Sequence, residues 1–312
     1  KHRITIAELK HNLFLLVVCF WQDFGKASTL RFSLRSQEKY APWIRHIWIV
    51  TADRETQRPD WLSSTASHIT LVEHSEIFPE WAKAKGALPT FNSCAIESVL
   101  HRIPGLAECY LYLNDDVLFL KPLYLHDFWS PELHAPYAWT NFQVAPYSPR
   151  NQPPWSVKLY NVAQDIRRAT GLDRKNVLLV GHHGHFFLKS KVVSMLENRV
   201  FGTCANRTTL ERWRTPKSFW VPFAFSNMLY ATHKATRKRV HALYFGLTDE
   251  GGVGQIKEAF HRIKNEVSKS KYAWVCFNDL IEEISWAQVE ALSSGFLEMF
   301  PNCSKAESEC DC

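Results

Sequence analysis

The sequence predicts an α/β fold built on a mostly parallel, Rossmann-like sheet flanked by helices. Short, β-rich apolar runs recur along the chain at the length of buried strands. Amphipathic segments with helical periodicity separate them, and this alternation is typical of sheets whose crossovers are helices. With 312 residues, 46% of them hydrophobic, the chain can bury the core of such a fold and is not disordered.

The first half of the chain carries the clearest alternation of the two element types. The expected strands are residues 13–20, 44–50, 69–72 and 110–113, and the expected helices are residues 30–40 and 94–101. The apolar run at 13–21 is too short for a bilayer, which needs ~20 residues, and we interpret it as a buried strand. Ligands of such sheets gather at the carboxyl ends of the strands.

The second half continues the pattern after a proline-rich connection at 148–155. Helices are expected at 156–170, 189–198, 222–232 and 285–299, and strands at 177–180 and 273–277. The glycine-rich stretch 251–254 lacks Walker or dinucleotide spacing and is interpreted as a loop. Without a repeat or a long linker, residues 1–312 are expected to form one domain. Its halves, about 1–147 and 156–312, pack together, and 303–312 form a flexible tail.

The charge balance indicates the kind of ligand the protein handles. A net charge of +6 suits an anionic substrate such as a nucleotide diphosphate. The basic residues form no dense run beyond the short segment 234–239, so no nucleic-acid partner is predicted.

Eight cysteines form no CxxC pair and no zinc-type spacing. Those at 303, 310 and 312 are either disulfide-bonded in an oxidising compartment or part of a reduced tail. The sequons that begin at Asn206 and Asn302 favour the secretory pathway.

Acidic residues follow two of the expected strands. Asp115 and Asp116 come directly after the strand at 110–113, and Asp279 follows the one at 273–277. Adjacent carboxylates repel each other unless a cation or solvent offsets the repulsion, and Mg²⁺ or Mn²⁺ is the usual cation beside substrate phosphates. The alternatives are a solvated turn for the pair and a helix N-cap for Asp279.

Imidazole and guanidinium groups complete the candidate chemistry. His182, His183 and His185 lie in a glycine-flanked loop, where one of them can take a proton from an acceptor hydroxyl. A histidine-only zinc site is disfavoured because three imidazoles within four residues cannot all face one point on a strand. Two arginine pairs are candidates for holding a diphosphate, with surface solvation as the alternative: Arg31 with Arg35, and Arg212 with Arg214.

Longer strings in the sequence resemble the Stealth family. Its second signature region is similar to LRFSLRS at 30–36, EKYAPWIR at 38–45 and IWIVT at 47–51. The similarity continues through 59–62, 74–79, 88–93, 95–97, 101–106 and 114–116. The third region resembles 182–185 with 212–217, and the fourth resembles 276–279, 300–301 and 304–307. Together the similarity covers most of residues 28–307.

The resemblance implies a nucleotide-sugar-transferase type of sheet and a phosphotransferase activity. Such an enzyme moves a hexose 1-phosphate, for example N-acetylglucosamine 1-phosphate, from a UDP-sugar to a glycan hydroxyl, and it releases UMP. Position by position, the resemblance assigns catalysis to His182, Asp116 and Arg214, a Mg²⁺ or Mn²⁺ site to Asp115, Asp116 and Asp279, and substrate binding to Arg31, Arg35, Asn92, Glu97 and His185.

Two positions depart from the family pattern. The stretch 16–21 (LVVCFW) has no acidic residue where the first region has an aspartate, and Ser218 stands where the third region has another. The alternatives are therefore a catalytically silent homologue that binds nucleotide-sugar or glycan, and an ordinary glycosyltransferase that releases UDP.

The resemblance also implies the partners, which are a UDP-sugar donor and a glycan or polysaccharide acceptor. A membrane is expected only through an anchor outside this chain, and a homo-oligomer is left open. Eukaryotic members of the family work in the Golgi and bacterial members in the cytoplasm. The sequons and cysteines favour the former.

Overall fold

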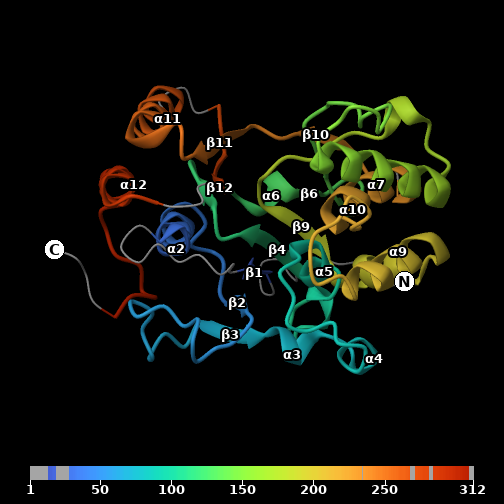
Figure 1. The fold of residues 1–312 in the computed structure, drawn as a ribbon, viewed down its shortest axis with the longest axis horizontal. Helices are drawn as coiled ribbons and strands as arrows, with labels where there is room; N and C mark the ends of the chain where they lie inside the picture. Colours follow the sequence, from blue (N-terminus) through green and yellow to red (C-terminus); the bar gives the residue numbers. More distant parts are fainter. Residues whose placement is uncertain (1–12, 19–27, 234, 268–270, 281–283, 309–312) are drawn as a thin grey trace.

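The structure is a computed structural model that describes residues 13–18, 28–233, 235–267, 271–280 and 284–308. A five-stranded sheet in the order β3-β2-β1-β4-β9 crosses its centre (Figure 1). Its strands are β1 (Leu13–Val18), β2 (Ile47–Thr51), β3 (Ile69–Glu73), β4 (Cys109–Asn114) and β9 (His185–Leu188). All neighbouring pairs are parallel except β4 with β9. The order β3-β2-β1-β4 is that of a Rossmann half, so the predicted fold class is confirmed.

A second, smaller sheet stands beside the first. It contains β5 (Val117–Phe119), β11 (Ala242–Thr248) and β12 (Trp274–Leu280), in the order β11-β12-β5. β11 and β12 are parallel, and β12 is antiparallel to β5. Because only Asp115 and Asp116 separate β4 from β5, the chain passes from the large sheet to the small one at this acidic turn.

Helices cover the sheets in two groups, which lie on opposite sides of Figure 1. The group on the left contains α2 (Thr29–Tyr40), α11 (Gly252–Val267) and α12 (Trp286–Met299). The group on the right contains α5 (Ser93–Glu97), α7 (Pro154–Thr170), α8 (Lys189–Glu197), α9 (Arg199–Thr209) and α10 (Val221–His233).

Short elements connect these parts. They are α3 (His74–Ile77), α4 (Glu80–Lys83), α6 (Leu125–Phe128), the 3₁₀ turns η2 (Leu100–Arg102) and η3 (Arg174–Asn176), and the strands β6 (Trp129–Ser130), β7 (Ala135–Pro136), β8 (Ala138–Thr140) and β10 (Arg237–Arg239).

Strand β4 divides the core between its two faces because side chains alternate along a strand. Tyr110 and Tyr112 pack into the cluster that includes α5, α7, α9 and α10. Leu111 and Leu113 pack into the opposite cluster, with Leu30 and Leu34 of α2. Tyr112 therefore projects toward the helices that form one wall of the site described below.

The segment before the C-terminus is packed rather than flexible. Glu307 is buried and binds two buried arginines of α2: its Oε2 lies 2.5 Å from Arg31 Nε and 2.6 Å from Arg35 Nη2. Arg35 also donates to the carbonyl oxygen of Phe300 at 2.9 Å. The expectation of a flexible tail is therefore wrong for residues 303–308, and residues 309–312 lie outside the described part of the chain.

Two local predictions are also corrected. Residues 177–180 form only an isolated antiparallel bridge, between Leu178 and Val144, and not a strand of a sheet. On the other edge of the segment, Asn227 binds both the N–H and the C=O of Leu178. The stretch 251–254 is not a loop throughout, since α11 begins at Gly252. Gln255 in the first turn of α11 accepts from Thr248 N and donates to Gly246 O, which fastens the helix to the end of β11.

Candidate active site

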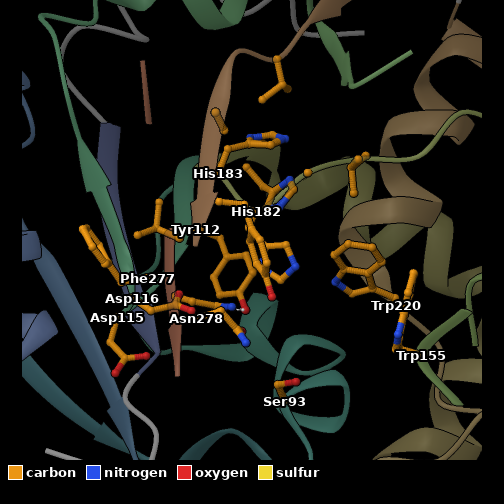
Figure 2. Close-up of a pocket in the computed structure, with 18 of the residues that line it drawn as sticks. Ser93, Tyr112, Asp115, Asp116, Trp155, His182, His183, Trp220, Phe277 and Asn278 are labelled. Carbon is orange, nitrogen blue, oxygen red and sulfur yellow. Dashed lines mark hydrogen bonds between the residues drawn. The ribbon is translucent and has the colours of Figure 1, made fainter. Parts of the chain in front are cut away.

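A cavity of about 950 Å³ opens at the carboxyl ends of β4 and β12, between the two groups of helices. Figure 2 shows Asp115, Asp116 and Asn278 on one side of it, with the indoles of Trp155 and Trp220 on the other. The histidine loop approaches between these sides. The predicted site residues that line the cavity are Glu97, Asp115, Asp116, His182, His185 and Arg214.

The acidic side of the cavity is held by β12. Phe277 N donates to the carbonyl oxygen of Asp116 at 2.9 Å, and Cys276 Sγ donates to Asp116 Oδ2 at 3.2 Å. Asn278, the next residue of β12, lines the cavity beside the two aspartates. Carboxylate and amide oxygens of this kind are suitable donors for Mg²⁺ or Mn²⁺.

For Asp279, the third expected carboxylate, the structure describes only the backbone position. Asp279 lies on β12 opposite Leu247, and its side chain lies outside the described part of the structure. Within the described ranges, no group of three or more histidine, cysteine, aspartate or glutamate side chains is arranged to hold a metal ion.

The histidines of this loop are held in the neutral form by their surroundings. Although His182 is an exposed residue, desolvation of its ring together with the positive charges of Lys158 and Arg214 lowers its pKa to about 4. Burial likewise lowers the pKa of His183 to about 4 and that of His185 well below its ordinary value. At neutral pH these imidazoles can accept a proton or a hydrogen bond.

Gly184 has a packing role in this loop. A Cβ atom at this position would lie 2.5 Å from the ring of Trp274, which is fully buried. His183 Nδ1 donates to the carbonyl oxygen of Gly184 at 2.7 Å. Gly184 therefore lets the histidine loop pass over the tryptophan.

Glu97 lines the cavity, and its surroundings favour the protonated carboxyl group. Tyr112 Oη lies 2.9 Å from Glu97 Oε1 and also contacts Asn114 Oδ1. Burial raises the pKa of Glu97 to about 7, against the opposing effects of the Tyr112 hydrogen bond, Lys158 and Arg214. Near neutral pH this carboxyl group therefore exists in both protonation states.

Two cations face this carboxyl group and His182. Arg214 comes from the loop that follows α9, and Lys158 comes from the second turn of α7. Lys158 Nζ lies 5.4 Å from the ring centroid of Trp220 and 3.8 Å from Cys94 Sγ. Sequence analysis missed Lys158, Tyr112 and Trp220. Only Tyr112 carried a signal, as the residue two positions before Asn114 on the same strand.

Three expected substrate-binding residues do not line the cavity. Arg31 and Arg35 hold Glu307, so their charges are used inside the fold. Asn92 is fully buried, caps α5, and donates from Nδ2 to the carbonyl oxygens of Glu211 and Trp213 at 3.1 and 3.4 Å. In this structure all three side chains therefore make contacts within the fold and lie outside the cavity lining.

Ser218 also holds the loop that follows α9. Its hydroxyl donates to Glu211 Oε2 at 2.6 Å and accepts from Thr215 N at 2.9 Å, and the side chain is fully buried. The departure from the family pattern at this position therefore falls on the loop that carries Arg214, outside the cavity lining. The other departure, at 16–21, extends beyond the described end of β1.

Two further observations concern the setting of the chain. No helix in the described ranges is long and apolar enough to cross a membrane. Cys303 is disulfide-bonded, whereas Cys94, Cys109, Cys204 and Cys276 are free.

Comparison with known proteins identifies relatives of this chain. Residues 23–136 match conserved region 2 of the Stealth proteins. An exopolysaccharide phosphotransferase of Streptomyces coelicolor is 33% identical over 287 residues, which are 90% of this chain and 45% of that protein. The N-acetylglucosamine-1-phosphotransferase subunits alpha/beta of Mus musculus are 48% identical over 107 residues, 34% of this chain and 8% of that protein. The chain thus spans less than half the length of either relative.

Among solved structures, the galactosyltransferase LgtC in complex with donor and acceptor sugar analogs aligns over 93% of this chain and 96% of its own. The identity is 11% and the TM-score 0.45, a likeness too distant to support an argument.

Proposed function

The chain belongs to the Stealth family, and from this premise we propose that it transfers a hexose 1-phosphate, such as N-acetylglucosamine 1-phosphate, from a UDP-sugar to a glycan hydroxyl. The products are a phosphodiester and UMP. One observation supports the proposal most directly: a single cavity joins two adjacent carboxylates, two cations and a neutral imidazole.

The proposed reaction is attack of the glycan hydroxyl oxygen on the phosphorus next to the sugar. The bond between that phosphorus and the oxygen bridging the two phosphates breaks, and UMP leaves with the bond's electrons. His182 takes the hydroxyl proton, for which a neutral imidazole is suited. Arg214 and Lys158 bind the phosphate oxygens, where fixed positive charge stabilises the charge that develops during transfer.

Glu97 and His185 line the same cavity and are proposed to bind the sugar or its phosphate. A Mg²⁺ or Mn²⁺ ion would be held by Asp115 and Asp116, with Asp279 as the third expected ligand. When bound, such an ion neutralises diphosphate charge.

Analysis of the nucleotide product tests this proposal. The protein is incubated with Mg²⁺ or Mn²⁺, a panel of UDP-sugars and polysaccharide acceptors, and UMP and UDP are quantified. We expect UMP, and a loss of turnover of at least ~100-fold in Asp116→Ala and in His182→Ala. Asp60→Ala is the matched control, because Asp60 is exposed and does not line the cavity.

Each other outcome points to a different function. UDP as the product would assign ordinary glycosyl transfer. Retained UDP-sugar binding without either nucleotide would assign a silent binding homologue. Unchanged rates in both cavity variants would overturn the site assignment.

We also propose a location in the secretory pathway, including the Golgi. Both sequon asparagines, Asn206 and Asn302, are exposed, and Cys303 is disulfide-bonded, which suits an oxidising compartment. Expression in eukaryotic cells followed by glycosidase treatment should shift the mass of the protein. An unmodified protein with reduced thiols would contradict this location.

A further inference from the structure

An exposed aromatic pair lies beside the cavity and has no role in the reaction proposed above. The rings of Phe91 and Trp213 are stacked, with centroids 4.6 Å apart and planes 16° from parallel. Phe91 is 40% exposed and Trp213 is 65% exposed. Large apolar side chains that remain this open on a folded surface usually mark a site of interaction.

Hydrogen bonds between two chain segments keep the pair in place. Phe91 N donates to Arg212 O at 2.8 Å, and Arg212 Nε donates back to Pro89 O at 2.9 Å. Asn92, next to Phe91, donates to the carbonyl oxygen of Trp213 at 3.4 Å. The two rings are therefore ordered before any ligand arrives, which lowers the entropic cost of binding.

The pair lies beside the mouth of the cavity. Arg214, adjacent to Trp213, lines the cavity, as does Ser93, two residues after Phe91. A third exposed aromatic residue, Trp155, also lines the cavity and is 64% exposed. Asn161 of α7 donates to Pro216 O at 2.7 Å, which holds the helix that carries Trp155 beside the loop that carries Trp213.

We propose that the stacked pair of Phe91 and Trp213 is a binding subsite for the acceptor glycan. A neutral sugar ring packs its C–H face on the open face of the Trp213 indole. The next sugar unit then extends past Arg214 into the cavity. This inference rests on the proposed function, because it identifies the surface that presents the acceptor hydroxyl.

The size and surroundings of the pair favour a sugar as its occupant. A flat apolar face about one ring wide matches one pyranose, whereas a stable protein interface needs roughly 800 Å² from each partner. Arg212 and Arg214, which flank Trp213 in the chain, and nearby Lys217 are exposed, so donors are available close to the indole for sugar hydroxyls.

Substitution of the indole separates acceptor binding from donor binding. In Trp213→Ala we expect the KM for the polysaccharide acceptor to rise about tenfold, equivalent to about 1.4 kcal/mol, while the KM for UDP-sugar stays unchanged. Trp213→Phe, which keeps an aromatic face, should recover most of the loss. Trp286→Ala is the control, because Trp286 on α12 is 84% exposed and lies outside the cavity lining.

A direct binding measurement makes the test independent of turnover. Maltotetraose, chitotetraose and mannotetraose are titrated into the wild type and the variants, and heat is recorded. We expect at least one of these probes to bind the wild type and to bind Trp213→Ala about tenfold more weakly, with thermal unfolding unchanged.

The outcomes distinguish this inference from the proposed function. Oligosaccharide binding that depends on Trp213 in a protein that releases no UMP would support the subsite and overturn the function. Normal UMP release with an unchanged acceptor KM in Trp213→Ala would overturn the subsite alone. The subsite would also be overturned if the wild type bound none of the three probes. Loss of self-association in Trp213→Ala would overturn it too, because the pair would then be a protein interface.

Discussion

Desolvation shifts the pKa values of two residues that line the cavity, in opposite directions. It lowers the pKa of His182 to about 4 and raises that of Glu97 to about 7. In both cases the uncharged form is favoured, because low dielectric surroundings penalise charge. Near neutral pH, a neutral His182 that can accept a proton and a protonated Glu97 that can donate one can therefore coexist in the site.

Lys158 modifies both groups, and its removal should be visible in their titration. In Lys158→Met we expect the pKa of His182 to rise, because a cation that disfavours the imidazolium is lost. Burial, the largest effect, remains, so the pKa should stay below its ordinary value. NMR titration of the His182 ring, assigned with His182→Ala, measures the change.

Lys175→Met is the matched control, because Lys175 is exposed and does not line the cavity. It should leave the His182 titration as in the wild type. If His182 titrated identically in Lys158→Met and in the wild type, Lys158 would not act on the imidazole electrostatically.

The sequence carried enough information to find the residues next to strand ends but not those brought in by helices. Asp116 follows β4 directly, and His182 lies in a glycine-flanked loop; both produced a local signal, and both line the cavity. Lys158 is one polar residue on a long amphipathic helix. Its place in the cavity depends on how α7 packs, which no local pattern encodes.

For Arg31 and Arg35 the sequence predicted the position on the helix but not the binding partner. Their spacing of four residues correctly placed them on one face of a helix, yet that face turned out to be buried against Glu307, 272 residues away from Arg35. In the sequence, two arginines four residues apart look the same whether they bind a substrate phosphate or a distant carboxylate of the same chain.

Among the elements, the segment after α12 is fixed to α2 by the Glu307 carboxylate, by the bond from Arg35 to Phe300 O and by the bond from Lys305 N to Glu38. Burial works to raise the pKa of Glu307, but hydrogen bonds from Arg35, Ser304 N and Arg31 act more strongly, and the pKa is lowered overall. In Glu307→Gln both buried guanidinium groups lose the charge of this carboxylate. Breaking a buried pair in this way should cost about 3 kcal/mol of the free energy of unfolding in urea.

Glu298→Gln provides the comparison, because Glu298 pairs with Lys264 on the surface, where both side chains are at least 60% exposed. That change should cost less than about 1 kcal/mol. Equal losses in the two variants would mean that the Glu307 contacts add nothing beyond an ordinary surface pair.

One expected strand failed to join a sheet because a side chain binds one of its edges. Residues 177–180 are apolar and β-rich and make an antiparallel bridge from Leu178 to Val144, but on the other edge Asn227 of α10 takes the hydrogen bonds of Leu178. The strand that joins the sheet is β9, which begins at His185, so the histidine loop precedes a strand rather than following one. Such an exchange depends on a contact 49 residues distant and leaves no periodic signal.

For the whole molecule, buried histidines should make stability depend on pH. Burial is the largest effect that lowers the pKa of His74, His101 and His183 to about 4. In the unfolded chain they titrate near 6.5, so the unfolded state binds more protons below that pH. Stability should therefore fall as the pH drops from about 6.5 toward about 4.

Glu97 acts in the other direction, because its raised pKa means that the folded state binds the proton more tightly below pH 7. Three imidazoles outweigh one carboxyl group, and we expect a net loss of about 2 kcal/mol between pH 7 and pH 5.5. Urea unfolding at the two pH values measures it. His101→Gln should reduce the loss, and equal or greater stability at pH 5.5 would contradict the burial of these rings.

The neighbouring strands β5 and β12 have a consequence for how such a protein can diversify. They pair side by side, yet the chain between them, residues 120–273, makes a long excursion that contains α7, α9 and α10. Asp116 stands just before its start and Asn278 just after its end. The excursion also supplies β9 to the large sheet and β11 to the small one, so it is anchored in both. Trp155, Lys158 and Arg214 belong to this excursion and not to the acidic turn, so their wall of the cavity can change in sequence while the turn that carries Asp115 and Asp116 is kept.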